Sequence, residues 1–369
     1  MLTRRTLITV GAATSLGAAG LLGGRSVSKG RSEYEHAVRQ LWQHGAPGSS
    51  DIPAILRECA RYATLAPSSH NTQCWKIGLG AQSVAILPDY ERRCPIVDPD
   101  DHHLFVSLGC AAENFVQAAA AMGFRGDAVF NAGTTESLAI SLERTPAIRT
   151  PLFEAIPHRQ STRGEYDGKP LSTVDLQLLE TAGSGSGVRV HLRTDRKGME
   201  NVLDFVVQGN TAQMRDPAFV RELKHWLRFN GGQAARLGDG LFAGSSGNPS
   251  APDWLGPLMF DLFFTETAEN DKYARHVRSS AGIAVFVSDA SDKQHWIETG
   301  RAFQRFALQA TALGVRTAHL NQPVEVASLR PQFAQSLGIP TGRPDLVIRF
   351  GRGPEMPRSL RRPLDAVVV

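Results

Sequence analysis

The segment APSSHNTQCW at residues 66–75 is the most informative stretch of the chain. Pro67 is expected to end a helix, and the two serines after it supply hydroxyl groups and free backbone amides. The side chains of Asn71 and Gln73 can each donate and accept hydrogen bonds. This combination suits a planar heterocycle with alternating carbonyl and N–H groups. A simple capped turn is the alternative interpretation of the segment on its own.

A second polar segment, HRQSTRGEY at residues 158–166, carries two arginines four residues apart with a serine between them. Arg159 and Arg163 can each offer a fork of N–H donors, and Ser161 adds a hydroxyl. This arrangement predicts a phosphate-binding loop. A solvated basic turn is the alternative when this segment is taken alone.

Taken together and in this order, the two segments resemble motifs of the nitroreductase family of flavin-dependent oxidoreductases. That family carries A-P-S-x-x-N-x-Q-P-W and R-x-S-x-R/K motifs; in this chain Cys74 replaces the usual proline. The C-terminal part is also similar, with LGIP at 337–340, an expected strand ending at Gly351, and RRPL at 361–364. The resemblance covers most of residues 50–369 and implies a bound FMN.

Two long helices with matching residues indicate an internal duplication. They are expected over His103–Met122 and Gln294–Leu313. A shift of 191 residues aligns six identical positions, and two unrelated alanine-rich helices are the alternative. The matching pairs are Gly109 and Gly300, Ala111 and Ala302, Phe115 and Phe306, Ala119 and Ala310, Ala121 and Ala312, and Gly123 and Gly314.

The remaining pattern predicts an α+β fold built from two fused, imperfect repeats that pack as an intramolecular pseudo-dimer. A further helix is expected from Asp51 to Ala66, with an aspartate cap and a proline in its first turn. Runs rich in β-branched residues predict strands at Val84–Leu87, Val188–Leu192, Ile283–Val287 and Leu346–Phe350. The expected organisation is a leader (1–31), a first repeat (32–150) and a second repeat (151–369).

The second repeat contains a long insertion at about 209–275, rich in glycine and aromatic residues. Such an insertion in a compact domain is usually a lid or a binding loop. A local satellite core is the alternative. Its aromatic residues are Trp226, Phe229, Trp254, Phe260, Phe263 and Phe264.

The family resemblance implies one complete FMN site per chain. In ordinary family members FMN lies at a homodimer interface, whereas here the two copies are fused and each lacks a different motif. The chain is similar in this respect to the fused, Acg-type subgroup. The implied ligands of the phosphate and ribityl end are Arg159, Gln160, Ser161 and Arg163, with Arg361 or Arg362 closing the phosphate site.

The same resemblance implies the residues around the flavin ring. Leu320, Asn321 and Gln322 would lie beside the flavin N5 edge, where the family has Ile-Glu-Gly. Asparagine in place of that glutamate argues against ordinary nicotinamide-driven catalysis. His103 would contact the flavin, although an ordinary histidine at a helix start is an equally good interpretation. The residues expected to border the isoalloxazine are Pro67, Ser68, Ser69 and Asn71.

These expectations favour an FMN-dependent oxidoreductase that passes electrons through flavin N5 to a nitroaromatic or quinone-like acceptor. The electron donor would be NADH, NADPH or a membrane redox partner. A non-catalytic protein that sequesters FMN under a lid is the alternative. No residue spacing predicts a metal site, and a monomer is sufficient because the dimer is fused.

The N-terminal residues predict export. The paired Arg4 and Arg5 precede an uncharged, weakly apolar stretch at residues 7–24, as in a twin-arginine signal. The twin-arginine export machinery is then a partner, and the protein is periplasmic or otherwise extracytoplasmic. An ordinary secretory signal, or an uncleaved leader that anchors the chain, is the alternative.

The charge of the chain argues against a nucleic-acid partner. Lys and Arg number 40 against 36 acidic residues, but residues 1–31 hold five basic residues and no acidic one. The rest of the chain has a net charge of −1, so no excess of positive charge is left for a binding face. The four cysteines are expected to be small buried or semi-buried residues.

Overall fold

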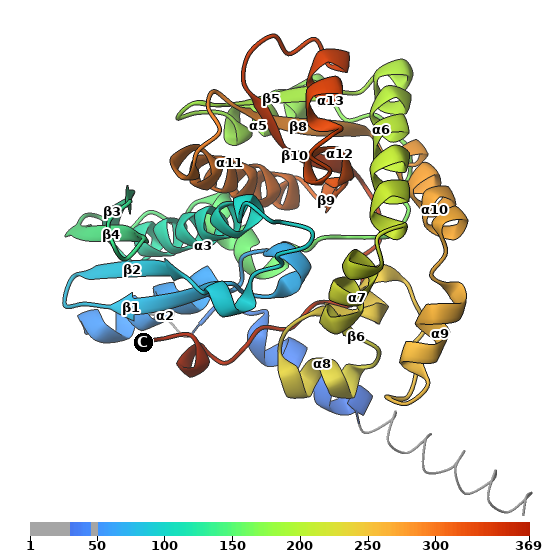
Figure 1. Ribbon diagram of the computed structural model, residues 1–369. Helices are drawn as coiled ribbons and strands as arrows, with labels where there is room; N and C mark the ends of the chain where they lie inside the picture. The colour runs from blue at the N-terminus through green and yellow to red at the C-terminus, as the bar shows by residue number, and fades with distance from the viewer. Residues whose placement is uncertain (1–29, 46–50) are drawn as a thin grey trace, which may run out of the picture.

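The computed structural model describes residues 30–45 and 51–369 (Figure 1). It holds two four-stranded antiparallel sheets, ordered β1-β2-β4-β3 and β5-β8-β10-β9. In chain order, both sheets place their strands as first, second, fourth and third. The strands are β1 (Trp75–Leu79), β2 (Ser83–Pro88), β3 (Phe124–Asn131), β4 (Ser137–Arg144), β5 (Val188–Arg193), β8 (Gly282–Ser288), β9 (Arg316–His319) and β10 (Arg343–Gly351).

The helices around the two sheets also occupy equivalent places. Helix α2 (Ile52–Thr64) precedes β1, and α3 (His102–Ala121) joins β2 to β3. Helix α5 (Thr173–Gly183) precedes β5, and α11 (Lys293–Ala312) joins β8 to β9. The three long helices expected from the sequence are therefore confirmed.

The start of α2 follows from its sequence. The Asp51 carboxylate accepts a hydrogen bond from Ala54 N at 3.2 Å, and a proline occupies the first turn. Ile55, Leu56 and Cys59 then point to one side and are buried. The helix ends before the polar segment at 66–75, whose two ends, at Ala66 and at Cys74 and Trp75, are buried in the core.

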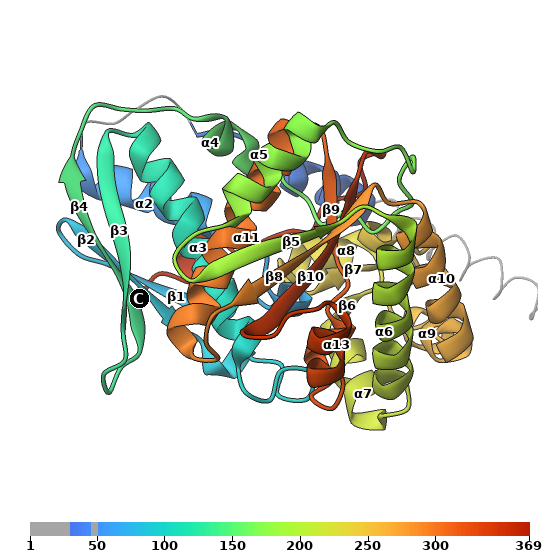
Figure 2. The ribbon, with the colours of Figure 1, turned by 90° about the horizontal axis from the view of Figure 1, so that it is seen from above.

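Helices α3 and α11 pack on each other between the two sheets, and glycines set the contact (Figure 2). A Cβ on Gly109 would overlap the main-chain oxygen of Ile297, and a Cβ on Gly300 would overlap that of Val106. Each glycine thus meets the residue three positions before the other glycine. Only glycine allows the two backbones to approach so closely.

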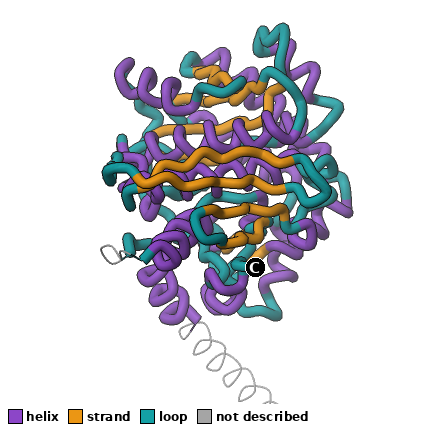
Figure 3. Tube along the Cα trace, turned by 90° about the vertical axis from the view of Figure 1, so that its left-hand side faces the viewer, coloured by secondary structure: helices purple, strands orange, loops and turns teal. Residues whose placement is uncertain are grey.

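One hydrophobic core runs from the first sheet through α3 and α11 to the second sheet, so helices lie between the strand layers (Figure 3). Ile86, Phe115, Phe306 and Phe286 illustrate this path, and all four are fully buried. Among the described helices, α3 alone is long and apolar enough to cross a membrane by length and composition. Its most apolar window is 78% buried inside the protein, as in the core helix of a globular domain.

The segment between β5 and β8 is longer than the expected insertion. Residues 209 and 275 fall inside the continuous helices α6 and α10, so the excursion runs from 194 to 281. The excursion comprises α6 (Arg196–Met214), α7 (Pro217–Trp226), β6 (Leu227–Arg228), α8 (Gly231–Leu237), β7 (Leu241–Phe242), α9 (Gly256–Phe263) and α10 (Glu266–Arg278).

The C-terminal tail returns from the second sheet to the first. Ile77 N donates to Val367 O at 2.8 Å, and Val369 N donates to Ile77 O at 3.0 Å, which extends the first sheet beyond β1. The tail thereby passes the polar segment at 66–75. The other helices are α4 (Pro151–Ala155), α12 (Gln322–Glu325) and α13 (Arg330–Ser336).

Two further expectations concern the leader and the cysteines. Residues 1–29 of the expected leader lie outside the described residues, so the twin-arginine signal stays a prediction. The four cysteines are free and buried, as expected. Strands β1, β3, β4 and β9 were not predicted, because they are short or alternate with exposed polar residues.

Candidate functional site

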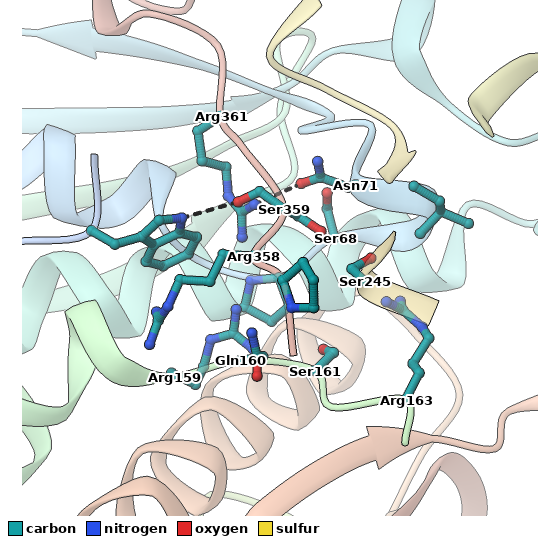
Figure 4. Close-up of a pocket in the computed structure, with 14 residues that line it drawn as sticks. Ser68, Asn71, Arg159, Gln160, Ser161, Arg163, Ser245, Arg358, Ser359 and Arg361 are labelled. Carbon is teal, nitrogen blue, oxygen red and sulfur yellow. Dashed lines mark hydrogen bonds between the residues drawn. The ribbon is translucent and has the colours of Figure 1, made fainter. Parts of the chain in front are cut away.

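The two polar segments lie on the walls of one pocket (Figure 4). Pro67, Ser68 and Asn71 come from the turn after α2, and Arg159 and Ser161 come from the segment after α4. The turn follows helix α2 of the first half of the chain. The other segment follows α4 and leads into α5 of the second half. This pocket adjoins a larger cavity of about 270 Å³, which shares Pro67, Ser68, Arg163 and Leu241 with it.

The Arg159 guanidinium is buried, and two of its nitrogen atoms lack a hydrogen-bond acceptor in the described chain. Its side chain is 3% exposed, and its Nε and Nη1 atoms have no hydrogen-bond acceptor among the described residues. Burial, together with the nearby charges of Arg358 and Arg163, lowers the pKa of Arg159 to about 10. An unpartnered buried guanidinium is costly, so this position fits an anionic ligand.

The rest of the pocket is also positively charged. Arg163 makes no hydrogen bond or ion pair within the described chain, and burial lowers its pKa. No carboxylate is among the described residues that line this pocket, whereas four arginines are. The hydroxyls of Ser161 and Ser245 face the same space in Figure 4. Guanidinium forks with hydroxyls are the donors that a phosphate group prefers.

Gln160 lines the pocket, but its side chain is already hydrogen-bonded within the protein. Its Oε1 accepts from Met356 N at 3.0 Å, and its Nε2 donates to Met356 O at 2.5 Å. These two bonds attach the C-terminal tail to the 158–166 segment. Gln160 thus positions the wall of the pocket, and both polar atoms of its amide already have a partner within the protein.

Arg361 does not have the role that was expected for it. It lines the pocket, but its guanidinium donates to the carbonyl oxygens of Thr64, Leu65, Ala66 and Leu360 and to Asn71 Oδ1, at 2.8–3.1 Å. These bonds occupy all five of its N–H donors. The tail supplies Arg361 as a cap for the C-terminal carbonyls of α2, so no donor is left for a phosphate.

Arg362 lies outside both pockets. Its Nη2 donates to Gln73 O at 2.9 Å and to Trp75 O at 3.4 Å, and its main-chain N–H donates to Gln73 Oε1. The expectation that Arg361 or Arg362 closes the phosphate site is therefore wrong in its geometry. Arg361 instead holds the tail against the end of α2, and Arg362 holds it against Gln73 and Trp75 at the start of β1.

Arg358, which the sequence motif did not identify, is another arginine of the pocket. It lines the pocket beside Arg159 and donates to the carbonyl oxygens of Pro157 at 2.6 Å and His158 at 3.2 Å. Its guanidinium lies 5.2 Å from the ring centre of Trp42, a cation–π contact. Burial lowers the pKa of Arg358.

Asn71 also acts within the protein. Its Nδ2 donates to Gly240 O at 2.9 Å and to Leu360 O at 3.0 Å, and its Oδ1 accepts from Arg361. The neighbouring Gln73 donates to Gly238 O at 2.8 Å. Asn71 therefore ties the excursion and the tail to the turn after α2. Its side chain offers little to a heterocycle.

The larger cavity contains the remaining expected ring contacts. Ser69, His103, Asn321 and Gln322 line it. Leu320 does not: its side chain packs in a separate core cluster, and its N–H donates to Val347 O at 2.7 Å. Leu320 alternates with the residues that face the cavity, as expected at the end of strand β9.

Histidines near the cavity differ in the direction of their pKa shifts. Burial would lower the pKa of His103, but the hydrogen bond and charge of Asp98 outweigh it, so the pKa is raised. His103 Nδ1 lies 3.6 Å from Asp98 Oδ1, and its Nε2 lies 3.3 Å from Asn321 Nδ2. Burial lowers the pKa of His70 to about 4 and that of His319 to about 3, helped by Arg163. Neither of these two histidines was expected at the site.

The excursion forms the wall opposite the second sheet. Phe260 and Phe264 stack on each other with ring centres 4.4 Å apart, and both line the cavity. Tyr273 of α10 lines it as well. Other parts of the excursion make satellite cores, such as Phe219 and Trp226 packed with Cys94 and Val97. Both expected roles of this segment therefore have support in the packing.

Two groups of side chains are close enough to share a metal ion, although no metal was expected. One is His70, Cys94 and Glu222, and the other is Asp98, His102 and His103. The Glu222 carboxylate already accepts from the N–H groups of Ile96 and Val97 at 3.0 Å. Partners within the protein explain the groups without a metal. In the second group, His102 pairs with Asp345 at 3.0 Å.

Comparison with known proteins gives distant relatives, and no family model matches the chain. The Mycobacterium tuberculosis protein named "Putative NAD(P)H nitroreductase Rv3131" is 24% identical over 322 residues, which are 85% of this chain and 90% of that protein. "Putative NAD(P)H nitroreductase acg" from the same species is 23% identical over 331 residues, with 85% and 95% coverage.

Solved structures are less similar. A nitroreductase with bound FMN from Bacteroides fragilis has a TM-score of 0.35 and 16% identity over 56% of this chain and 89% of that chain. An NADPH:FMN oxidoreductase from Vibrio harveyi has a TM-score of 0.33 and 15% identity, with 58% and 73% coverage. On the similarity of sequence along most of its length, the chain is a distant homologue of the mycobacterial nitroreductase-type proteins, Acg among them.

Proposed function

We propose that this protein binds FMN and acts as an oxidoreductase of the nitroreductase type. The observation that carries this proposal is the buried Arg159, whose Nε and Nη1 have no partner in the described chain. A phosphate beside it would accept these two hydrogen bonds and offset the burial of the charge. Arg163, Arg358 and Ser161 would complete the phosphate end.

The adjoining cavity would hold the flavin ring. Pro67, Ser68 and Ser69 border the passage between the two spaces, and His103 and Asn321 line the far side. When bound, FMN supplies the redox chemistry, since flavins accept a hydride and pass electrons on. The protein's own residues bind the phosphate, position the ring and limit the access of water. The His103–Asp98 pair can hold a proton beside the cavity.

We further infer that the chain is a fused pseudo-dimer with one flavin site. The matching strand orders, the equivalent places of α3 and α11, and the reciprocal contacts of Gly109 and Gly300 support this inference. A symmetric interface makes such reciprocal contacts. The complementary loss of motifs between the copies leaves one phosphate loop and one Pro-Ser segment, facing a common pocket.

The test is a flavin assay on the purified protein. An absorption spectrum and the phosphate released per chain would show whether a single FMN is bound. Anaerobic addition of NADH or NADPH would then show whether the flavin is reduced, and a quinone or nitroaromatic whether it is reoxidised. A colourless protein that takes up no added FMN would refute the proposal. Two flavins per chain would refute the single site alone.

A non-catalytic role in flavin sequestration is the second candidate, and the wall formed by Phe260 and Phe264 favours it. Those rings line the cavity proposed for the flavin and would restrict the room for a nicotinamide or an acceptor. A protein that binds FMN tightly, and whose bound FMN is not reduced by NADH, NADPH or quinols, would support this role. We also propose that the protein is exported by the twin-arginine route and that a membrane redox partner can be its electron donor.

A further inference from the structure

Helix α9 is apolar on two opposite sides. Phe260 and Phe264 face inward and line the cavity. Leu258, Leu262 and Phe263 face outward, with exposed fractions of 55%, 68% and 68%. A helix at the surface of a globular protein usually turns a polar side to water. The outer side of α9 therefore needs an explanation that the cavity does not provide.

The residues next to α9 extend this apolar surface. Trp254, in the turn before the helix, is 72% exposed, the most exposed large hydrophobic side chain in the described chain apart from the C-terminal Val369. The Trp254 side chain and the three outward residues of α9 are called the α9 patch below. Tryptophan with leucine and phenylalanine is the composition of helices that lie in a membrane interface.

The site at which the undescribed leader joins the molecule lies on the same part of the protein. Gly30, the first described residue, meets Gly232 of α8, and the tilted rings of Tyr34 and Phe242 pack with their centres 4.7 Å apart. Asn230, at the start of α8, donates to Asp253 Oδ1 at 2.6 Å, beside Trp254. In Figure 1, α8 and α9 lie at one end of the molecule. The described chain begins at Gly30, which lies against Gly232 of α8.

We propose that the α9 patch docks on the surface of a lipid bilayer. The inserted side chains would be Trp254, Leu258, Leu262 and Phe263, near the point where the described chain begins at Gly30. A second copy of the chain is the weaker explanation. The patch consists of four side chains, whereas a stable dimer interface involves roughly 20–30 residues on each partner. The proposal does not depend on bound FMN.

The charges around the patch specify the kind of bilayer. Lys224 pairs with Asp261 at 2.7 Å, and Arg236 pairs with Asp253 at 3.6 Å. Because each nearby basic side chain has an acidic partner, little net charge is left to attract anionic lipids. Docking is therefore expected on zwitterionic phosphatidylcholine, without a requirement for phosphatidylglycerol.

The test uses the full chain and vesicles of phosphatidylcholine with brominated acyl chains, which quench tryptophan within the bilayer. Trp75, Trp226 and Trp296 are buried and Trp42 is partly buried, so Trp254, which is 72% exposed, would dominate the quenching. Quenching by these vesicles, lost in Trp254→Phe and in a Leu258→Ser/Leu262→Ser/Phe263→Ser variant, is the expected result. Val174→Ser/Leu178→Ser is the matched control, because it removes exposed apolar side chains of α5 and should keep the quenching.

Local quenching distinguishes docking by α9 from attachment by the leader alone. If the chain sediments with vesicles but Trp254→Phe leaves the quenching unchanged, or if no quenching occurs, the proposal is wrong. A concentration-dependent dimer that disappears in the triple serine variant would also overturn it. Circular dichroism checks the fold of the triple serine variant. If the triple variant does not fold, the conservative Trp254→Phe change still gives a result.

Discussion

Asn71 Oδ1 accepts a hydrogen bond of 2.8 Å from Arg361 Nη1, across 290 residues of chain. Both residues belong to motifs that resemblance connects with flavin binding, yet in this structure they bind each other. The pair fixes the turn after α2 to the C-terminal tail. That arrangement leaves Arg159, Arg163 and Arg358 as the cations with capacity for an anion in the pocket.

Replacing Arg159 should weaken FMN binding without lowering the stability of the FMN-free protein. In Arg159→Met we expect FMN affinity to fall about ten- to a hundredfold, since a charged hydrogen bond contributes about 1.5–3 kcal/mol. The FMN-free variant should be at least as stable as the parent, because two unpartnered buried donors are removed. FMN titration and urea unfolding of the FMN-free protein measure the two effects. Arg163→Met should weaken binding similarly.

Arg189→Met serves as the control, because Arg189 is exposed on β5 and pairs with Asp289. Its FMN affinity should equal that of the parent. Equal affinity in the Arg159, Arg163 and Arg189 variants would mean that the phosphate does not bind in this pocket.

Replacing Arg361 should mainly reduce stability, whereas replacing Arg358 should mainly reduce FMN affinity. Arg361→Met leaves the buried carbonyls of α2 and Asn71 Oδ1 without a donor, so we expect a loss of at least about 3 kcal/mol in the free energy of unfolding. Arg358→Met loses two bonds at the edge of the pocket and should mainly reduce FMN affinity. The same titration and unfolding experiments apply. A stable Arg361 variant with selectively impaired FMN binding would restore its expected phosphate role.

The contact between the two halves should tolerate no side chain at its centre. Gly300→Ala places a Cβ on the main-chain oxygen of Val106, and we expect destabilisation by about 3 kcal/mol or more because two rigid helices must separate. Gly133→Ala is the control, since no atom lies within 4 Å of its added Cβ. Thermal unfolding compares the two. A Gly300 variant as stable as the Gly133 variant would show that the α3–α11 contact can shift freely.

Acid should destabilise the protein through its neutral buried histidines. Burial lowers the pKa of His319 to about 3, below the usual value of 6.5. Because the unfolded chain binds this proton first, stability is full above about pH 6.5 and is lost as pH falls towards the folded pKa. In His319→Gln the pH slope of the unfolding free energy should be smaller by up to about 1.4 kcal/mol per pH unit.

Urea unfolding between pH 4 and pH 7 would measure this slope. His70 and His102, whose pKa values are also lowered to about 4, should keep a residual slope in the variant. An unchanged slope in His319→Gln would mean that this imidazole is protonated in the folded state, as a bound anion nearby would favour.

The aromatic wall should control access to the flavin. In Phe260→Ala/Phe264→Ala we expect faster FMN dissociation and faster reduction by NADH, because the two rings line the cavity from the excursion. Phe263→Ala changes an exposed neighbour on the same helix and should leave both rates unchanged in the absence of vesicles. Stopped-flow absorbance measures reduction, and dilution fluorescence measures release. Equal rates in all three proteins would show that the excursion acts only as a satellite core.

The sequence by itself determined the local structure and the chemical inventory. Asp51 and Pro53 specify the start of α2, and the matching glycines at 109 and 300 specify where two long helices approach each other. Hydrogen-bonding and periodicity rules act over a few residues, so these features could be predicted. The two motif segments at 66–75 and 158–166 could likewise be recognised as parts of one pocket.

Only the tertiary structure decided which polar groups are free to bind a ligand. An arginine offers the same five donors in any sequence, and those of Arg361 are satisfied by carbonyls at the end of α2, whereas those of Arg159 are not. That difference arises from contacts between segments almost 300 residues apart, which no local rule encodes. The same holds for α9, where packing turned Phe260 towards the cavity and left Phe263 exposed.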